Sequence, residues 1–176
     1  GGVVGGMLSK GGHDVTLIDT WYEHVSEIQK NGLEVTNQDE VHLCKPNAIH
    51  LNKLQEIKEK FDIGIIAVKS YDTEWVTHAL KNYVKDDGYF VVTCPDLESV
   101  CKVIADGNLV KPLYQSPAGP ISAIDILYGL RPALEKGNHY MAHNIGFNKE
   151  LLHITLKECG FASAAVASWS PTYVLW

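Results

Sequence analysis

The chain has 176 residues, which is enough for one mid-sized domain or two small ones. Apolar residues make up 45% and charged residues 20%, so the chain can bury a hydrophobic core. With 15 basic against 21 acidic residues, the net charge of −6 argues against sequence-independent binding to nucleic acid or to an anionic membrane. No run of about 18 apolar residues is present, so we expect no membrane span. The first methionine is Met7, and we expect the chain to begin inside a longer protein.

The first half alternates helix and strand patterns. A segment of small apolar residues at 2–10 ends at Gly11-Gly12, which is typical of a helix C-terminus. The β-branched run that follows ends at Asp19 and predicts a buried strand. The continuous apolar run at 63–68 predicts a strand covered on both faces. We expect further strands at 33–36, 41–44 and 89–93, and helices at 22–31, 52–60 and 72–84. This alternation predicts βαβ units and a parallel sheet.

The second half is richer in proline and has fewer strand patterns. We expect helices at 96–105, 122–130 and 148–159, and a last strand at 161–168. The change in composition near residue 85 is the best domain boundary. The 4 cysteines form no C-x-x-C pair, and we expect them to be reduced and mostly buried, as in a cytoplasmic protein.

Glycines 1, 2, 5 and 6 precede the strand that ends in Asp19. In a dinucleotide-binding unit, glycines let the backbone approach a pyrophosphate, and an acidic residue at the end of the second strand binds the ribose hydroxyls. The alternative is that small residues let this helix pack closely against a sheet. The complete pattern of glycines, helix, strand and Asp19 favours the cofactor site.

A second candidate site follows the apolar strand, at Ala67-Val68-Lys69-Ser70-Tyr71-Asp72-Thr73. Ligands of open α/β sheets bind at the carboxyl ends of strands, where a lysine can reach a phosphate or a carboxylate. The alternative is a solvated lysine beside a helix that Ser70 or Asp72 caps.

Residues 1–80 resemble the N-terminal, cofactor-binding domain of the ketopantoate reductases (2-dehydropantoate 2-reductases). The resemblance lies in the glycine helix, the segment from Gly12 to Asp19, Asn31-Gly32-Leu33, and the segment from Ala67 to Thr73. It implies that Val68 and Lys69 lie at the nicotinamide cofactor, and that Asp19 and Thr20 lie near the adenosine ribose. It also makes Gly1 the third glycine of the fingerprint, so we expect the first strand and the phosphate-binding turn to be missing and dinucleotide binding to be weak.

From residue 84 the chain resembles the late part of a class I S-adenosylmethionine-dependent methyltransferase. The segment from Asp87 to Leu97 resembles the strand that ends in Pro-Asp-Leu in those enzymes, and 116–147 resembles a subgroup of predicted methyltransferases. Cys94-Pro95-Asp96 stands where ketopantoate reductases carry a Gln-Asn-Gly-type segment. No lysine can be assigned as the general acid that ketone reduction needs.

We therefore expect an α/β, Rossmann-like, three-layer parallel sheet that lacks its first strand. Residues 1–84 form the dinucleotide-binding segment and 85–176 the methyltransferase-like segment. The leading function is reduction of a 2-keto acid with NADP(H) or NAD(H), by a cytoplasmic protein that forms a homo-oligomer. The alternatives are methyl transfer from S-adenosylmethionine and a catalytically inactive α/β module.

Weaker patterns lie in the second half. The spacing of His139 and His143 occurs in metal sites, but no third ligand is identifiable, so we expect no metal. Asp125 with His143 is a candidate acid/base pair. An aromatic tail of Trp169, Tyr173 and Trp176 suggests packing or an oligomer contact.

Overall fold

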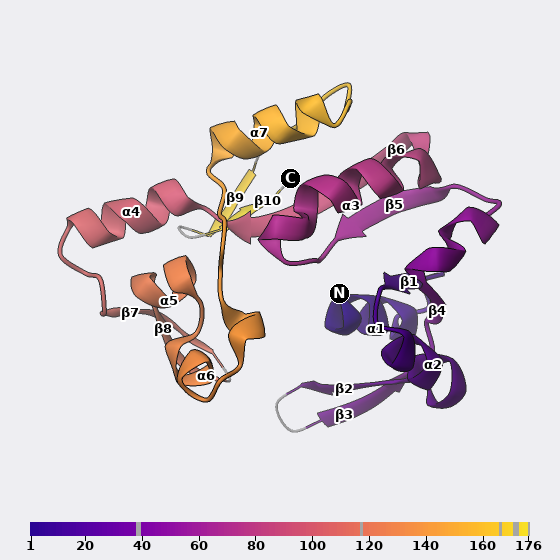
Figure 1. Cartoon of the computed structure of the whole chain (residues 1–176), viewed down its shortest axis with the longest axis horizontal. Coiled ribbons are helices and arrows are strands. Elements are labelled where there is room, and N and C mark those ends of the chain that lie inside the picture. The colour runs from indigo at the N-terminus through magenta and orange to yellow at the C-terminus, as the bar shows by residue number, and fades with distance from the viewer. Residues whose placement is uncertain (38–39, 117, 166, 171–172, 176) are drawn as a thin grey trace. The chain divides into compact units, whose positions relative to one another are not determined.

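A computed structural model describes residues 1–37, 40–116, 118–165, 167–170 and 173–175. The chain divides into two compact units, Gly1–Lys60 and Phe61–Trp176, which are taken one at a time below. The helices and strands are labelled in Figure 1. The division after residue 60 comes earlier than the predicted change of resemblance near residue 84, which is where a long strand of the second unit begins. That the second segment derives from a methyltransferase stays a prediction.

The first unit combines a parallel strand pair with a β-hairpin. Its elements are α1 (Gly2–Lys10), β1 (Thr16–Asp19), α2 (Tyr22–Asn31), β2 (Leu33–Asn37), β3 (Glu40–Cys44), β4 (Asn47–His50) and the 3-10 helix η1 (Leu51–Glu56). β1 pairs with β4 in parallel, and β2 pairs with β3 antiparallel. The core consists of Val25, Ile28 and Ala48, with Leu17 and Leu33 packed against it. The predicted helix at 52–60 is wrong, because only the 3-10 helix η1 forms there.

Two glycines of α1 are required by packing within this unit. A Cβ on Gly6 would lie 2.8 Å from Val35 Cγ2 and 3.1 Å from Leu33 Cδ2. A Cβ on Gly5 would collide with the Leu17 side chain. The helix therefore approaches β1 and β2 closely, as the packing alternative for the glycines required. Both glycines are buried, so close packing accounts for them without a cofactor.

The second unit is built on a mixed four-stranded sheet in the order β5-β6-β10-β9. β5 (Phe61–Ile66) pairs in parallel with β6 (Val84–Pro95), and β10 (Tyr173–Leu175) is antiparallel to both β6 and β9 (Ala167–Ser170). The shorter elements are η2 (Ser70–Asp72), α3 (Thr73–Leu80), η3 (Lys81–Tyr83), β7 (Pro112–Ser116), β8 (Gly119–Ser122), α6 (Arg131–Glu135) and η4 (His139–Met141).

The remaining helices build two cores in this unit. α3 and α7 (Lys149–Glu158) pack on the sheet through Val76, Leu152 and Leu156, which contact Ile66 and Val92. α4 (Leu97–Ala105) and α5 (Ala123–Tyr128) enclose a smaller core of Val100, Ala123 and Ile126.

One face of β5 is covered and the other is open. Ile66 is buried, whereas Ile63 and Ile65 are 56% and 44% exposed. The prediction that this strand is covered on both faces is therefore wrong for the described residues, because α3 and α7 both pack on the Ile66 face.

The α/β class predicted from the sequence is confirmed, and two strand pairs are parallel. The strands are divided among separate sheets, and among the described residues no strand joins β1 to β5. The predicted strand at 161–168 is wrong, since the extended segment is β9 at Ala167–Ser170. Within the part of the chain that the structure describes, no helix has the length and apolar character needed to cross a membrane.

None of the described cysteines is in a disulfide bond. Cys44 and Cys159 are buried as predicted, and burial raises the pKa of the Cys159 thiol. Cys101, on α4, is exposed, so the expectation of burial is wrong for that residue. Its neighbour on α4, Val100, is completely buried.

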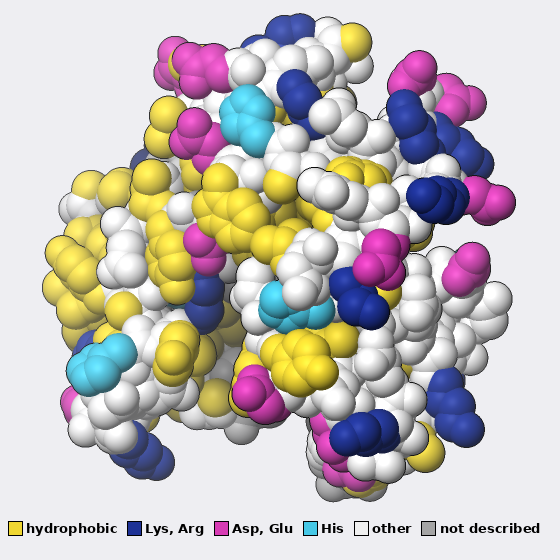
Figure 2. Space-filling model, turned by 45° about the vertical axis from the view of Figure 1, so that its right-hand side comes forward, with side chains coloured by type: hydrophobic (Ala, Val, Ile, Leu, Met, Phe, Trp, Pro, Cys, Tyr) yellow, Lys and Arg dark blue, Asp and Glu magenta, His cyan; other side chains and the backbone are white. Residues whose placement is uncertain are grey.

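The surface mixes side chains of every kind. On the face drawn in Figure 2, basic side chains are interspersed with acidic and hydrophobic ones. The exposed aromatic residues include Trp21, Tyr22, Tyr89 and Tyr140. The side chains of the predicted aromatic tail, Trp169, Tyr173 and Trp176, lie outside the described residues.

Candidate functional site

Asp19 ends β1 immediately before α2, as the sequence pattern predicted. Its Oδ1 accepts a hydrogen bond of 2.9 Å from the backbone N–H of Trp21. Its Oδ2 lies 3.4 Å from Nδ1 of His24, which is in the first turn of α2. The side chain of Asp19 is 43% exposed. A carboxylate beside a helix N-terminus interacts favourably with the helix dipole, and solvent can reach this one.

Thr20 follows Asp19, and β4 fixes its backbone. The parallel register pairs Asp19 with His50. The N–H of Asn52 donates to His50 Nδ1 at 3.2 Å, so the ring proton of the neutral histidine is on Nε2. His50 Nε2 lies 2.8 Å from the Thr20 carbonyl oxygen and donates to it. The loop after β1 is thus tied to the end of β4.

Two exposed aromatic residues lie next to the histidines of this region. Trp21 and Tyr22 are 62% and 64% exposed. The Trp21 ring centre is 5.3 Å from that of His24, and the Tyr22 ring centre is 6.0 Å from that of His50. None of these four residues was predicted from the sequence as a site residue. His24 could have been predicted, because it follows Asp19 by 5 residues, in the first turn of the next helix. His50 could not, because it reaches this region through the pairing of β4 with β1, which no local pattern reveals.

Gly1 lies close enough to Asp19 to feel its charge. Burial lowers the pKa of the Gly1 amino group, and the negative charge of Asp19 partly opposes that shift. The Gly1 carbonyl accepts the first helical hydrogen bond of α1, from Gly5 at 2.9 Å. The structure therefore brings together three of the predicted cofactor residues, Gly1, Asp19 and Thr20, at one end of the first unit.

Val68 and Lys69 belong to the second unit, directly after β5. Val68 is 44% exposed, and Lys69 is half-buried. The Lys69 carbonyl accepts a hydrogen bond from the Asp72 N–H at 2.9 Å, which closes the turn into α3. Asp72 does not cap α3 through its side chain, because its Oδ1 accepts the indole N–H of Trp75 at 2.6 Å. The turn follows the carboxyl end of β5, and the assignment of Val68 and Lys69 to a cofactor site stays a prediction.

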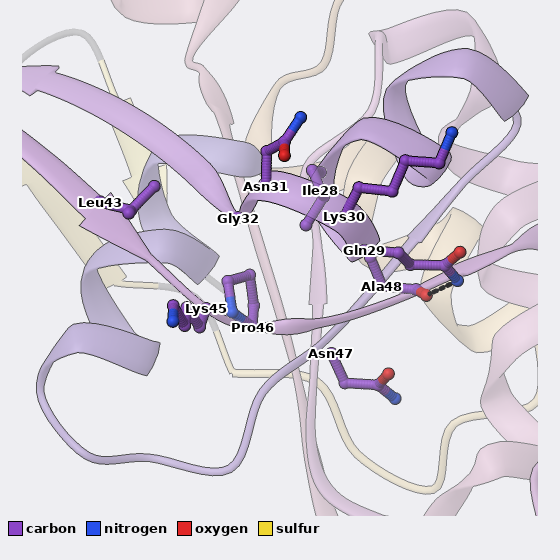
Figure 3. Close-up of a pocket in the computed structure, with 10 residues that line it drawn as sticks. All are labelled: Ile28, Gln29, Lys30, Asn31, Gly32, Leu43, Lys45, Pro46, Asn47 and Ala48. Atoms are coloured by element: carbon purple, nitrogen blue, oxygen red, sulfur yellow. Dashed lines mark hydrogen bonds between the residues drawn. The ribbon is translucent and has the colours of Figure 1, made fainter.

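A surface cavity of about 420 Å³ occurs elsewhere in the first unit (Figure 3). It lies between the end of α2 and the segment from Leu43 to Ala48, and Gln29 Nε2 donates to the Ala48 carbonyl across it at 2.7 Å. Asn47 begins β4 and pairs with Thr16, whereas Asp19 pairs at the other end of β4. The cavity is therefore at the amino ends of the parallel strands, away from the predicted ribose site.

The buried carboxylate of Asp125 serves the fold. It is 4% exposed and accepts the Ser122 N–H at 2.9 Å and the Arg131 Nε–H at 2.8 Å. The Arg131 guanidinium, helped by the Ser122 hydroxyl, holds the pKa of this carboxyl well below its usual range. His143 instead points Nδ1 at the Ile126 carbonyl, 2.7 Å away. The predicted Asp125–His143 acid/base pair is therefore wrong, because each group has a different partner.

In the described ranges, no group of three or more His, Cys, Asp or Glu side chains is placed to hold a metal ion. His139 belongs to η4, which ends at Met141, and His143 follows it outside any helix. A shared helix face for these two histidines does not exist in the described structure.

The family is identified by sequence comparison. The family model described as "Ketopantoate reductase PanE/ApbA" matches residues 1–94, which is more than half of the chain. The chain therefore belongs to the ketopantoate reductase family, as the glycine helix and the segment from Ala67 to Thr73 predicted. The match ends at residue 94, so residues 95–176 lie outside it.

A curated relative, the 2-dehydropantoate 2-reductase of Lactococcus lactis subsp. lactis (strain IL1403), is 34% identical over 80 residues. These residues are 46% of this chain but only 25% of the relative, so the chain spans about a quarter of that protein's length.

Solved structures align more loosely. A crystal structure described as a 2-dehydropantoate 2-reductase from Enterococcus faecalis aligns with a TM-score of 0.44 and 23% identity, over 52% of this chain and 36% of that one. A D-mandelate dehydrogenase solved with NADH and anilino(oxo)acetate also aligns with a TM-score of 0.44, at 24% identity over 56% of this chain and 31% of that one. Scores this low support no functional conclusion.

Proposed function

We propose that this chain supplies the cofactor-binding part of an enzyme that reduces a 2-keto acid, such as ketopantoate, with a nicotinamide cofactor. The observation that carries the proposal is the exposed Asp19 carboxylate at the carboxyl end of β1, within the region that the family model matches. Carboxylates at this position of a dinucleotide-binding unit accept hydrogen bonds from the ribose hydroxyls. Gly1 beside it lies where the helix N-terminus would face the pyrophosphate.

The same carboxylate favours NAD(H) over NADP(H). A 2′-phosphate placed on the adenosine ribose would bring two like charges together, and cofactor sites that accept it use an arginine nearby. The single arginine of the chain, Arg131, is in the second unit and is bonded to Asp125. We therefore assign the adenosine ribose of NAD(H) to Asp19 and Thr20.

The residues present fit the ribose end of this cofactor. Asp19 keeps its Oδ1 bonded to the Trp21 N–H, which orients the carboxylate while leaving the side chain 43% exposed. Val68 and Lys69 are the residues that we assign to the nicotinamide half, since they follow a parallel strand at its carboxyl end. The ammonium group of Lys69, a half-buried residue, can bind an anionic group of the cofactor or of the keto acid.

When bound, the reduced nicotinamide supplies a hydride to the ketone carbon. The chain's own residues hold the cofactor: Asp19 binds and orients the ribose, and Lys69 provides a positive charge beside the reacting end. Reduction also needs a proton donor near the substrate oxygen. We assign no residue of this chain to that donor.

Binding of NADH, NADPH and S-adenosylmethionine to the 176-residue chain tests the proposal. Because we expect weak binding, ligand-detected NMR at millimolar ligand is the suitable measurement. We expect saturable binding of NADH, weaker binding of NADPH, and a loss of NADH affinity of about tenfold in Asp19→Ala, which corresponds to one lost hydrogen bond to a charged group.

A matched pair of lysine substitutions separates a specific role of Lys69 in NADH binding from the general effect of removing a positive charge. Lys69→Ala should weaken NADH binding, whereas Lys111→Ala removes an exposed lysine of the same unit and should not. Binding of S-adenosylmethionine alone would favour the methyltransferase alternative and refute the reductase. If none of the three ligands binds, the inactive module is the better description.

A further inference from the structure

His24 is the side chain that faces the free edge of the Asp19 carboxylate. Asp19 Oδ1 is bonded to the Trp21 N–H, whereas Oδ2 lies 3.4 Å from His24 Nδ1. The imidazole is 33% exposed, so protons reach it from solvent. A histidine side chain changes its charge between about pH 5 and 8. The net charge at the ribose site therefore depends on His24 as well as on Asp19.

Other titratable groups near Asp19 and His24 lie on β4, α1, η1 and α2. On β4, His50 uses both ring nitrogens, with Asn52 and with the Thr20 carbonyl. On α1, the Gly1 amino group feels the charge of Asp19. The exposed Lys53 and Glu56 lie on η1, and Glu23 and Glu27 lie on α2, where Glu27 Oε1 accepts the Asn31 side-chain amide. Of these groups, His24 is the histidine whose ring lies within hydrogen-bond distance of the Asp19 carboxylate.

We propose that His24 sets how strictly the ribose site discriminates between a free 2′-hydroxyl and a 2′-phosphate, through its charge next to Asp19. With neutral His24, Asp19 is an uncompensated anion that accepts ribose hydroxyls and repels a phosphate. With protonated His24, the pair is neutral overall, and the imidazolium attracts the phosphate. The inference rests on the proposed function and adds a pH-dependent cofactor choice to it.

The effect is read from the ratio of the NADPH to the NADH dissociation constant. We expect this ratio to fall about tenfold from pH 8 to pH 5.5, the size of a charge interaction that shifts a proton equilibrium by one unit. The 2′-phosphate itself gains a proton near pH 6, which also reduces repulsion. A variant that keeps a polar side chain but does not titrate is needed to separate the two effects.

His24→Gln is that variant. Its amide retains a hydrogen-bond donor for Asp19, and its ratio should change with pH only as far as the phosphate's own protonation requires. His13→Gln, at an exposed histidine in the turn after α1, is the matched control and should behave as the unmodified chain. Circular dichroism at each pH checks that the variants stay folded.

The outcomes are distinct. A steeper pH dependence in the unmodified chain and in His13→Gln than in His24→Gln supports the inference. The same pH dependence in all three chains, with NADH bound, overturns the role of His24 and leaves the proposed function standing. If neither dinucleotide binds at either pH, both the proposed function and this inference are refuted.

Discussion

Replacing Gly6 with alanine tests why α1 is rich in glycine. The added Cβ would lie 2.8 Å from Val35 Cγ2 and 3.1 Å from Leu33 Cδ2, both in β2. Val35 is 3% exposed and its β-branched side chain has restricted rotation, so it cannot turn away. Alanine in a helix interior gains about 1 kcal/mol over glycine, and overpacking costs about 1–3 kcal/mol. We expect the overpacking to win, with a net loss of about 1–2 kcal/mol in the free energy of unfolding.

Gly2→Ala is the matched control on the same helix. Its Cβ would meet Leu33 Cδ2 at 3.7 Å, an ordinary contact. The substitution should be neutral or stabilise the protein by up to about 1 kcal/mol. Denaturation in urea followed by circular dichroism, with midpoints compared at equal slope, measures both variants. In the Gly6→Ala background, Val35→Ala removes the obstructing methyl groups and should recover part of the loss.

The result also separates packing from cofactor binding. Equal midpoints for Gly6→Ala and Gly2→Ala would refute the packing argument. If Gly6→Ala kept full stability but lost NADH binding, the glycine would instead serve the approach of the cofactor.

Three further predictions concern the second unit. Leu152→Ala, at a completely buried side chain, should cost about 2–5 kcal/mol of unfolding free energy, whereas Leu151→Ala, at a side chain 44% exposed, should cost far less in the same urea titration. Asp125→Asn should lower stability at pH 7 by about 2 kcal/mol. Because the pKa of Asp125 is depressed in the folded state, its ionised carboxylate stabilises the fold above about pH 4, and this stabilisation is lost as the pH falls further. In thermal scans, the melting temperatures of the unmodified chain and of Asp125→Asn should therefore converge in acid. Cys101 should react with a thiol reagent in the folded chain and Cys159 only after unfolding, as followed by mass spectrometry, and protection of Cys101 until unfolding would contradict the packing of α4.

Elements with strong local signals were predicted closely. The helices expected at 2–10, 22–31 and 96–105 are observed as Gly2–Lys10, Tyr22–Asn31 and Leu97–Ala105. Helical spacing of apolar residues and the end signals at Gly11 and Gly32 depend on neighbours a few residues away, so the sequence carries them directly. The family was also recognisable from short segments, and the family model confirms it.

Elements that depend on distant partners were missed or misjudged. β4 exists because Asn47–His50 pairs with β1, and no pattern within that short segment predicts a strand. The sequence offered Asp125 and His143 as a candidate acid/base pair, but in the fold Asp125 binds Ser122 and Arg131. β5 was expected to be covered on both faces, but its helices pack on one.

The sequence by itself determined the α/β class, the family and the position of Asp19 at the end of a strand, because each is encoded in local patterns. Only the tertiary structure decided what surrounds that carboxylate: the Trp21 N–H, the imidazole of His24, and a loop that His50 fixes from another strand. It also decided that Gly5 and Gly6 are needed for packing, since the side chains that exclude a Cβ come from β1 and β2. The sequence specifies which side chains are present, but contacts between segments far apart in sequence determine which groups surround each of them.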